Sequence, residues 1–193
     1  NMRLIVSLIM ALLVGFLGYL VYSSIQEPIA FSAEKGKRSD AVAAQLTKIR
    51  TLQEIYRSIK GSYAGDFQEL VTTIKNDSIP FENIEGDPDD PTNLDKVRRF
   101  VTYQSALDTV KAMGISLENL DVIPYTDGQK FTMQTDTIEY QSTMVNVIEV
   151  GTTWKTFMGE YADPKYKKYD NRYNPDAAFK FGDLSTPSLN GTW

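Results

Sequence analysis

Few residues in this sequence could do chemistry, and one group of them is an acidic run. The stretch EGDPDDP carries three aspartates, Asp87, Asp89 and Asp90, whose carboxylate oxygens are the hard ligands that Ca²⁺ prefers. The run lacks the ligand spacing and the following glutamate of an EF-hand loop. Its two prolines favour a stiff, solvated loop instead. We therefore predict no bound cofactor and keep a calcium site as an alternative.

Tyrosines alternate with basic residues in a second stretch, YADPKYKKYDNRY. Its tyrosines and its arginine are Tyr161, Tyr166, Tyr169, Tyr173 and Arg172. Such a mixture can stack on bases and follow phosphates, or it can form a protein interface, where Tyr and Arg are enriched. A surface loop whose tyrosines cover a sheet edge is the third interpretation. The net charge of -5 and the pI near 4.8 argue against a nucleic-acid partner, which leaves a protein interface as the speculative functional role.

The composition excludes the common kinds of nucleophilic and metal catalysis. The sequence contains no cysteine and no histidine, so it cannot form a Ser-His-Asp triad, a Cys-His pair, a Cys/His zinc site or a disulfide. A Ser-x-x-Lys pair occurs at Ser32 and Lys35, but it falls near a predicted helix start, where a capping role explains the serine. We predict no catalytic residues and no enzymatic activity.

An uncharged apolar segment runs from Leu4 to Tyr22 near the start of the sequence. A helix of this length covers roughly 28 Å, close to the hydrocarbon thickness of a bilayer. Arg3 precedes the segment and the next basic residue is Lys35, so the positive-inside tendency predicts a cytoplasmic N-terminus and an exported body. A cleaved signal peptide is the alternative, although its apolar core is normally shorter. We predict a retained transmembrane anchor over residues 1–25.

Small residues recur along one face of the predicted anchor. Ser7, Ala11 and Gly15 stand four positions apart, which is the spacing that lets two membrane helices approach closely. Small residues are common in such helices, so a chance spacing is the alternative. The pattern predicts that this face packs against another copy of the chain or against another envelope protein.

A second helix is predicted after the anchor, within residues 26–60. Pro28 biases the preceding residue away from the helical conformation, so we expect a joint there. From Val42 to Ile59 apolar residues recur at steps of three and four, which is typical of an amphipathic helix. Gly61 provides a C-terminal stop. We expect this stalk helix to pack its apolar face on the body and to offer a surface to partners.

The remaining residues, 61–193, predict a globular α+β body with an antiparallel sheet, because short helices come first and short strands follow. Asp66 is expected to cap a short helix over residues 67–75, and the Asp- and Pro-rich residues 76–93 are expected to form a loop. Residues 108–117 are ambiguous, and residues 153–161 suggest a short helix. Strands are expected at residues 97–105, 120–124, 130–134, 137–140, 144–150 and 177–181.

The first 75 residues, roughly, resemble type IV pilins and the pseudopilins of type II secretion. An apolar helix leads into an amphipathic one, followed by an arginine, an aromatic, a Gly-x-Tyr and a short helix with a leucine. In this sequence these are Arg50, Tyr56, Gly61, Tyr63, Phe67 and Leu70. The chain departs from pilins at Ile5, where they carry a glutamate. The resemblance implies a filament-type subunit whose helix leads out of the membrane.

The whole sequence also resembles a family of uncharacterised single-pass envelope proteins of Gram-negative bacteria. The similar stretches are SIQEPIAF, IRTLQEIYRSIKGSYAGDFQELVTTIKN, IPYTDGQKF and FKFGDLSTPSLNGTW. This resemblance implies an inner-membrane location, with the N-terminus in the cytoplasm and the body in the periplasm, or outside the cell if the chain enters a filament. It implies no activity.

These patterns favour a non-enzymatic, membrane-anchored envelope protein that acts as a structural or assembly subunit, in its sharper form a pilin-like or pseudopilin-like one. Two alternatives stay open. One is an accessory subunit of a secretion, motility or envelope complex, and the other is a tethered periplasmic module that binds a ligand or calcium. The expected partners are the membrane and either the chain itself or other envelope proteins, and no nucleic acid is expected.

Overall fold

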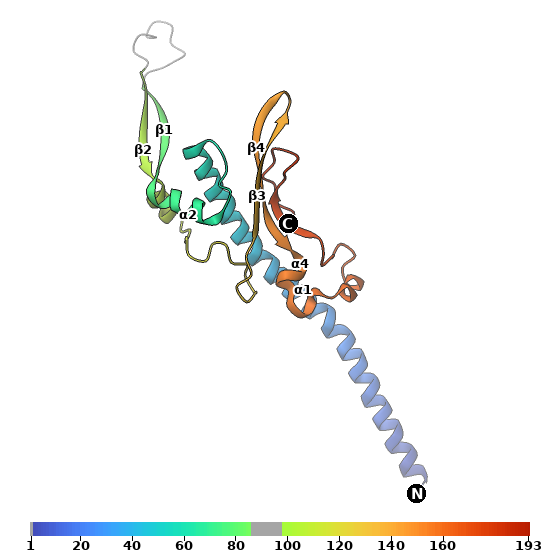
Figure 1. Cartoon of the computed structure of the whole chain (residues 1–193). Helices are drawn as coiled ribbons and strands as arrows, with labels where there is room; N and C mark the ends of the chain where they lie inside the picture. Colours follow the sequence, from blue (N-terminus) through green and yellow to red (C-terminus); the bar gives the residue numbers. More distant parts are fainter. Residues whose placement is uncertain (1, 86–97) are drawn as a thin grey trace.

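One long helix organises the molecule. The computed structural model describes residues 2–85 and 98–193 (Figure 1). Helix α1 spans Met2–Lys60, and the body is gathered around its C-terminal half while its N-terminal half extends away from everything else. Gly61 follows with a φ of +80°, a conformation that glycine adopts without strain, so the predicted stop is confirmed. Short helices and antiparallel sheets complete the body, which confirms the α+β class.

Pro28 lies inside α1, and the helix continues through it. We predicted a joint at this position between an anchor over residues 1–25 and a stalk over residues 26–60. The joint is absent from α1 as the structure describes it, although proline removes one backbone hydrogen bond. Phe31, one turn further on, is buried against the body, and this packing holds the following turn in place. The local preference of the residue before Pro28 predicted a break in the helix, and tertiary contacts override that preference.

The C-terminal half of α1 forms the centre of the core. Val42, Leu46, Ile49 and Leu52 have no exposed surface, which confirms the apolar face that the spacing predicted. Around them α1 contacts α2 (Phe67–Asn76), β1 (Ser78–Glu85), α4 (Trp154–Met158) and β5 (Ala178–Gly182). The body is therefore built around the helix, and the helix cannot detach without opening the core.

Helices α2 and α3 begin at capping residues. The backbone N–H of Glu69 donates to the Asp66 carboxylate at 2.7 Å, which confirms the predicted cap of α2. Helix α3, Ala106–Ala112, resolves the segment that was ambiguous in sequence, and Ser105 caps it. After α4 come two 3₁₀ helices, η2 at Gly159–Ala162 and η3 at Pro164–Lys168.

The larger sheet has three antiparallel strands in the order β3-β4-β5. β3 (Thr132–Tyr140) and β4 (Thr143–Thr153) form one long hairpin, where we predicted shorter separate strands. The predicted strand at 120–124 is wrong, because only an isolated bridge joins Val122 to Lys130 there. The predicted last strand at 177–181 is confirmed as β5 to within a residue.

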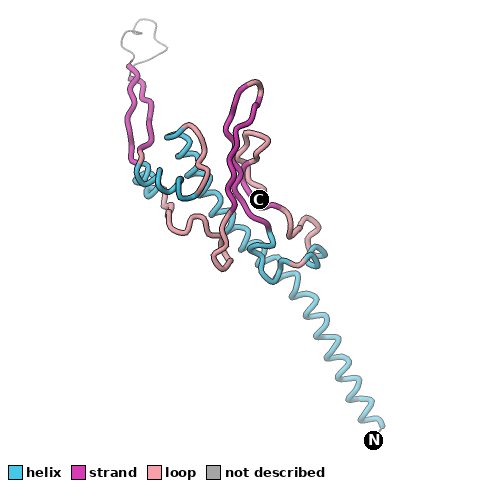
Figure 2. The backbone as a smooth tube through the Cα atoms, viewed as in Figure 1, coloured by secondary structure: helices cyan, strands magenta, loops and turns pink. Residues whose placement is uncertain are grey.

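The smaller sheet is a two-stranded ribbon made of β1 and β2 (Arg98–Ser105) that stands off from the rest of the body (Figure 2). Its register pairs Ser78 with Ser105 and Glu85 with Arg98. The strand predicted at 97–105 is confirmed as β2. The loop predicted over 76–93 is wrong over Ser78–Glu85, which forms β1, and residues 86–93 lie outside the described residues.

A buried glutamine fastens the end of α1 to the chain that follows it. Gln53 has no exposed surface; its amide nitrogen donates to the carbonyl of Ala64 at 3.2 Å, and its amide oxygen accepts from the Ala64 N–H at 2.9 Å. An unsatisfied buried donor or acceptor costs about 1–3 kcal/mol. These two hydrogen bonds to the backbone of Ala64 fix where the chain turns back from Gly61 onto the body.

Candidate functional site

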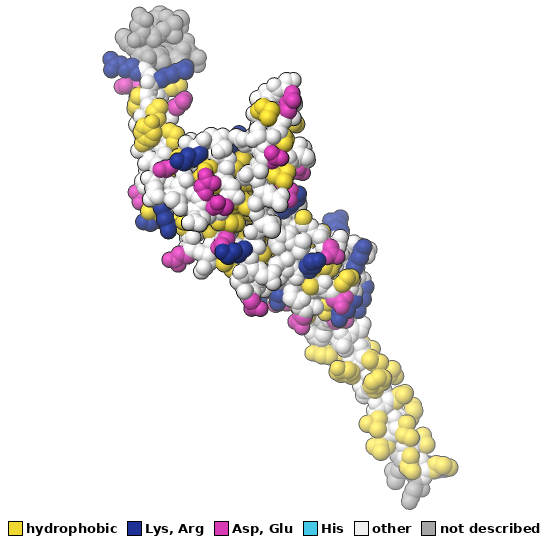
Figure 3. Space-filling view, viewed as in Figure 1, with side chains coloured by type: hydrophobic (Ala, Val, Ile, Leu, Met, Phe, Trp, Pro, Cys, Tyr) yellow, Lys and Arg dark blue, Asp and Glu magenta, His cyan; other side chains and the backbone are white. Residues whose placement is uncertain are grey.

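From Met2 to Ile25, helix α1 is covered with exposed apolar side chains that are not packed against the body in the part of the chain that the structure describes (Figure 3). Its most apolar 18-residue window has a mean hydropathy of 2.4 and is not buried at all. Soluble proteins rarely expose so large an apolar surface, whereas a bilayer core solvates it. One helix near the N-terminus is thus long and apolar enough to span a membrane, which is consistent with single-pass anchoring.

The predicted small-residue face lies on this exposed part of α1. Ser7, Ala11 and Gly15 are all exposed, and the Ser7 hydroxyl donates to the carbonyl of Arg3 at 2.8 Å. A Cβ added at Gly15 would meet no atom of residues 2–85 or 98–193 within 4 Å. The face is therefore open to another helix, and its role in packing stays a prediction.

Where α1 reaches the body, four tyrosines surround Phe31, whose side chain is only 2% exposed. The Phe31 ring stacks on Tyr166 with centroids 5.0 Å apart and meets Tyr173 edge-on at 5.1 Å. Tyr161 and Tyr169 lie at 6.0 and 6.3 Å from the same ring. We call these four tyrosines the tyrosine collar. Aromatic pairs in such geometries add about 0.5–1.5 kcal/mol each beyond the area they bury.

The collar includes every tyrosine of the stretch that we predicted as a speculative interface. Tyr166 and Tyr173 are buried against α1, while Tyr161 and Tyr169 are half-buried. Arg172 is exposed and is not part of the collar. The tyrosines therefore serve first to hold the chain's own helix, and a partner could reach Arg172 more easily than the buried rings.

Polar contacts tie the collar to α1 on both sides of Phe31. The Tyr169 hydroxyl donates to the Glu27 carboxylate at 2.5 Å, and this hydrogen bond lowers the pKa of Glu27. One turn beyond Phe31, the Lys35 ammonium bonds to Asp170 at 2.5 Å and lowers the pKa of that carboxyl group. Together these contacts set both the rotation and the height of the body on the helix.

The buried end of the collar makes folding sensitive to alkaline pH. Burial raises the pKa of Tyr173 from 10.0 to about 12, and its hydroxyl donates to the carbonyl of Tyr161 at 2.7 Å. Because the folded state favours the neutral phenol, this stabilisation is complete below pH 10 and is lost as the pH rises toward 12. We expect the melting temperature of the full chain to fall steeply over that interval, as followed by circular dichroism.

Tyr173→Phe provides the control for this pH dependence. The variant loses the hydrogen bond to Tyr161 and should melt lower at pH 8, but it should lose less further stability in alkali than the parent chain does. Tyr56 remains in both proteins. Burial and the hydrogen bond to Glu69 raise the pKa of Tyr56 to about 12 as well. Equal alkaline losses in the two proteins would show that Tyr173 does not cause the effect.

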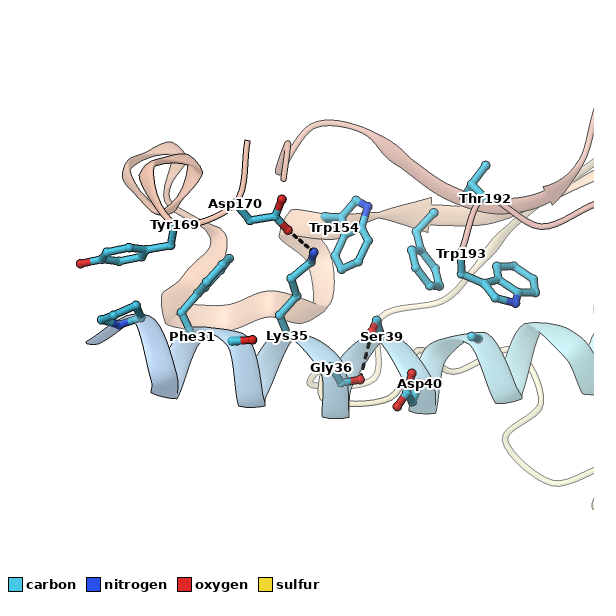
Figure 4. A pocket seen from close by; sticks show the side chains of 14 residues that line it. Phe31, Lys35, Gly36, Ser39, Asp40, Trp154, Tyr169, Asp170, Thr192 and Trp193 are labelled. Carbon is cyan, nitrogen blue, oxygen red and sulfur yellow. Dashed lines mark hydrogen bonds and ion pairs between the residues drawn. The ribbon is translucent and has the colours of Figure 1, made fainter. Parts of the chain in front are cut away.

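A groove of about 670 Å³ lies between α1 and the body, and it begins at the collar, where Phe31 and Tyr169 line it (Figure 4). Phe31, Lys35 and Asp40 line its helix side, and Trp154 and Trp193 lie across from them. The ion pair of Lys35 with Asp170 crosses the groove, and the Lys35 ammonium lies 5.3 Å from the centre of the Trp154 ring. The groove has aromatic walls and one internal ion pair.

The two residues of the Ser-x-x-Lys spacing both line this groove. The Lys35 ammonium is bound to Asp170, so it does not activate the Ser32 hydroxyl in this arrangement. Asp87, Asp89 and Asp90, the calcium alternative, lie outside the described residues. Among residues 2–85 and 98–193, no group of three or more acidic side chains is placed to hold a metal ion.

Sequence reasoning did not predict that Phe31, Lys35 and Arg38 meet the body, and it considered Lys35 only with Ser32, although a signal for all three contacts was present. The spacing of three and four that we followed from Val42 onward continues backward through these three residues. Arg38 donates to the carbonyl of Phe157 at 2.9 Å, as expected for a residue on the face that meets the body. Because we expected a joint at Pro28, we followed the helical spacing only from Val42 and did not extend this face toward Phe31.

Comparison with known proteins adds no relative: no protein-family model, no curated protein and no solved structure matches the chain. The resemblance to pilins and pseudopilins therefore rests on the sequence pattern. The helix, the collar and the exposed surfaces of the chain itself are what support a function.

Proposed function

We propose that the chain is a non-enzymatic, membrane-anchored structural subunit that assembles with copies of itself through its N-terminal helix. The observation that carries this proposal is the continuity of α1. One end of the helix is apolar and exposed, and the other end is the centre of the body's core. A single rigid element therefore leads from the bilayer into the folded domain.

Rigid coupling distinguishes such a subunit from a domain on a loose tether. Helix α1 has 59 residues, which at 1.5 Å per residue gives a length of roughly 90 Å. The collar and the Lys35–Asp170 pair fix the body on this rod. Packing such helices side by side would bring every body to the same height and rotation, as an ordered assembly requires. A tethered binding module gains nothing from this rigidity.

The sharper form of the proposal is a pilin-like or pseudopilin-like subunit. In support, the long helix carries an antiparallel sheet and short helices on its C-terminal half and leaves its apolar half bare. The proposed location is the inner membrane with the body in the periplasm, or outside the cell within a filament. Arg3, ahead of the apolar segment, supports that orientation through the positive-inside tendency.

The groove favours one other function, that of a tethered periplasmic module that binds a ligand. Its volume of about 670 Å³ lies within the range of small-molecule sites, which are concave and largely apolar. A melting shift of the full chain with a small aromatic or anionic compound would support this function, and no shift across such compounds would count against it. An accessory subunit of a larger complex would instead stay monomeric and purify with other proteins.

Gly15→Leu tests assembly through the small-residue face. We expect ordered polymers, seen by electron microscopy of native membranes and sheared supernatant, to disappear in this variant. Small residues at the contact let the two helix backbones approach closely, and a leucine there keeps the helices apart. The substitution is safe for the fold, because a Cβ at Gly15 meets no atom of the described residues within 4 Å.

Leu13→Phe is the matched control, since it adds bulk to the other side of the same exposed segment. This variant should assemble as the parent does, and both variants should remain in the membrane fraction. If Gly15→Leu assembles normally, or if both variants fail alike, the small-residue face is not the contact between copies.

A further inference from the structure

Two β-hairpins project from the end of the body that lies away from the N-terminus (Figure 1). The first is the ribbon of β1 and β2, and the second is the far half of the β3–β4 hairpin. The end of α1 lies between them, so the body ends in a fork with two prongs. This fork has no part in the anchor, the collar or the groove.

The fork carries most of the exposed large apolar side chains that lie outside the anchor. On the first prong these are Phe81, Ile84, Phe100, Val101 and Tyr103, and on the second they are Tyr140 and Met144. The register places apolar residues on both faces of the β1–β2 ribbon, with Phe81 and Phe100 on one face and Ile84 and Val101 on the other. A two-stranded ribbon of this kind is marginally stable alone in water, so contact with another chain would stabilise it.

Each prong also offers free strand edges, both strands of the first prong and β3 of the second. β2 is paired only with β1, and β3 is paired only with β4, so the outer side of each strand faces no other strand within the described residues. An exposed edge is a template for pairing with another chain.

The free edges of β2 and β3 are complementary in charge and similar in length. β2 reads RRFVTYQS and carries Arg98 and Arg99 with no acid, whereas β3 reads TMQTDTIEY and carries Asp136 and Glu139 with no base. The strands have 8 and 9 residues. The arginines stand at the end of the described part of β2 that lies away from the body, and Glu139 stands one residue from the turn of the β3–β4 hairpin.

The strand directions fit a pairing between neighbours. β2 runs from the tip of its prong toward the body, and β3 runs from the body toward the tip of its own. If two copies stand side by side with parallel α1 helices, β2 of one and β3 of the next are antiparallel, with their tips together. The rigid α1 holds both bodies at one height, so Arg99 of one copy and Glu139 of the next would meet.

We propose that the outer edge of β2 in one copy pairs antiparallel with the outer edge of β3 in a second copy of this chain. The proposal rests on the proposed function, because side-by-side anchoring supplies the parallel arrangement. Aligning Arg99 with Glu139 places Val101 opposite Thr137. Each copy donates one edge and accepts another, so the contact is heterologous and extends into a ring or an open filament.

Cysteine cross-linking tests this pairing directly, because the chain has no cysteine of its own. Val101→Cys and Thr137→Cys, made in two differently tagged full-length chains, are co-expressed and oxidised in native membranes. A disulfide needs Cα atoms about 4.4–6.8 Å apart, so it reports adjacent strands. We expect a several-fold higher yield of the mixed dimer than for Val101→Cys with Glu118→Cys, an exposed loop position outside both strands.

Charge exchange gives a second, independent readout. Reversing the charge of β2 with Arg98→Glu and Arg99→Glu should abolish the cross-link, and Asp136→Lys with Glu139→Lys in the other chain should restore it. No preferential cross-link in the parent pair, or no rescue by the reciprocal change, overturns the edge pairing. If Gly15→Leu still disperses the polymers in that case, the proposed function survives; if neither change has an effect, both proposals fail.

Discussion

Phe31→Ala is expected to destabilise the body by about 3–5 kcal/mol, the usual cost of truncating a buried phenylalanine to alanine. Phe31 is 2% exposed and contacts all four tyrosines of the collar. Its removal leaves a cavity between α1 and η3, where Tyr166 stacks on it. Denaturant unfolding of the full chain in mild detergent measures the loss.

In the Phe31→Ala variant, the segment that carries the collar should also open before the rest of the body unfolds. Without Phe31 the segment that carries the collar has little to hold it on α1, so limited proteolysis should cut near Lys165 or Lys168 sooner than in the parent chain. Ile29→Ala is the matched control, because Ile29 is 59% exposed and lies two residues away on the same helix. Equal destabilisation by both substitutions would show that the collar does not hold the body on the helix.

The apolar face of α1 could be predicted because its signal is local. The spacing from Val42 to Ile59 depends only on helix geometry, and the structure buries Val42, Leu46, Ile49 and Leu52 completely. The cap at Asp66 and the stop at Gly61 were predictable for the same reason. Each follows from backbone groups within one helical turn.

The collar could not be predicted, because its members are far apart in the chain. Lys35 and Asp170 are separated by 135 positions, and sequence spacing says nothing about such pairs. The tyrosines in residues 161–173 were visible as a group, but a group of tyrosines near lysines fits a surface as well as a core. The tyrosines face inward because Phe31 on α1 packs against them, and this contact is visible only in the structure.

β1 was missed because the ribbon has no buried side. Its sequence, SIPFENIE, contains a proline and an asparagine and shows no alternation of buried and exposed positions beyond Ile79. A strand with one face on a core shows alternating apolar and polar residues in its sequence, whereas a strand in a projecting ribbon need not show this alternation. The absence of that signal is consistent with a surface that is completed by another chain.

Two arginines in the middle of the apolar segment are expected to remove the chain from the membrane. Leu12→Arg with Leu13→Arg places two charges at the centre of the segment, at about 3 kcal/mol each. A total near 6 kcal/mol corresponds to roughly a 10⁴-fold shift in partitioning. The parent chain should stay in the membrane pellet after an alkaline wash, and the variant should be found in the supernatant.

Both leucines are exposed and lie outside the core of the described residues, so the loss is not expected to come from unfolding of the core. The collar should keep its aromatic circular dichroism signal in the variant, and Leu12→Ile with Leu13→Ile should pellet like the parent chain. A soluble, folded double-arginine variant would show that the exposed half of α1 is what holds the chain in the bilayer. If the variant stays in the pellet and resists the wash, the body itself binds the membrane, and a transmembrane role for this segment is wrong.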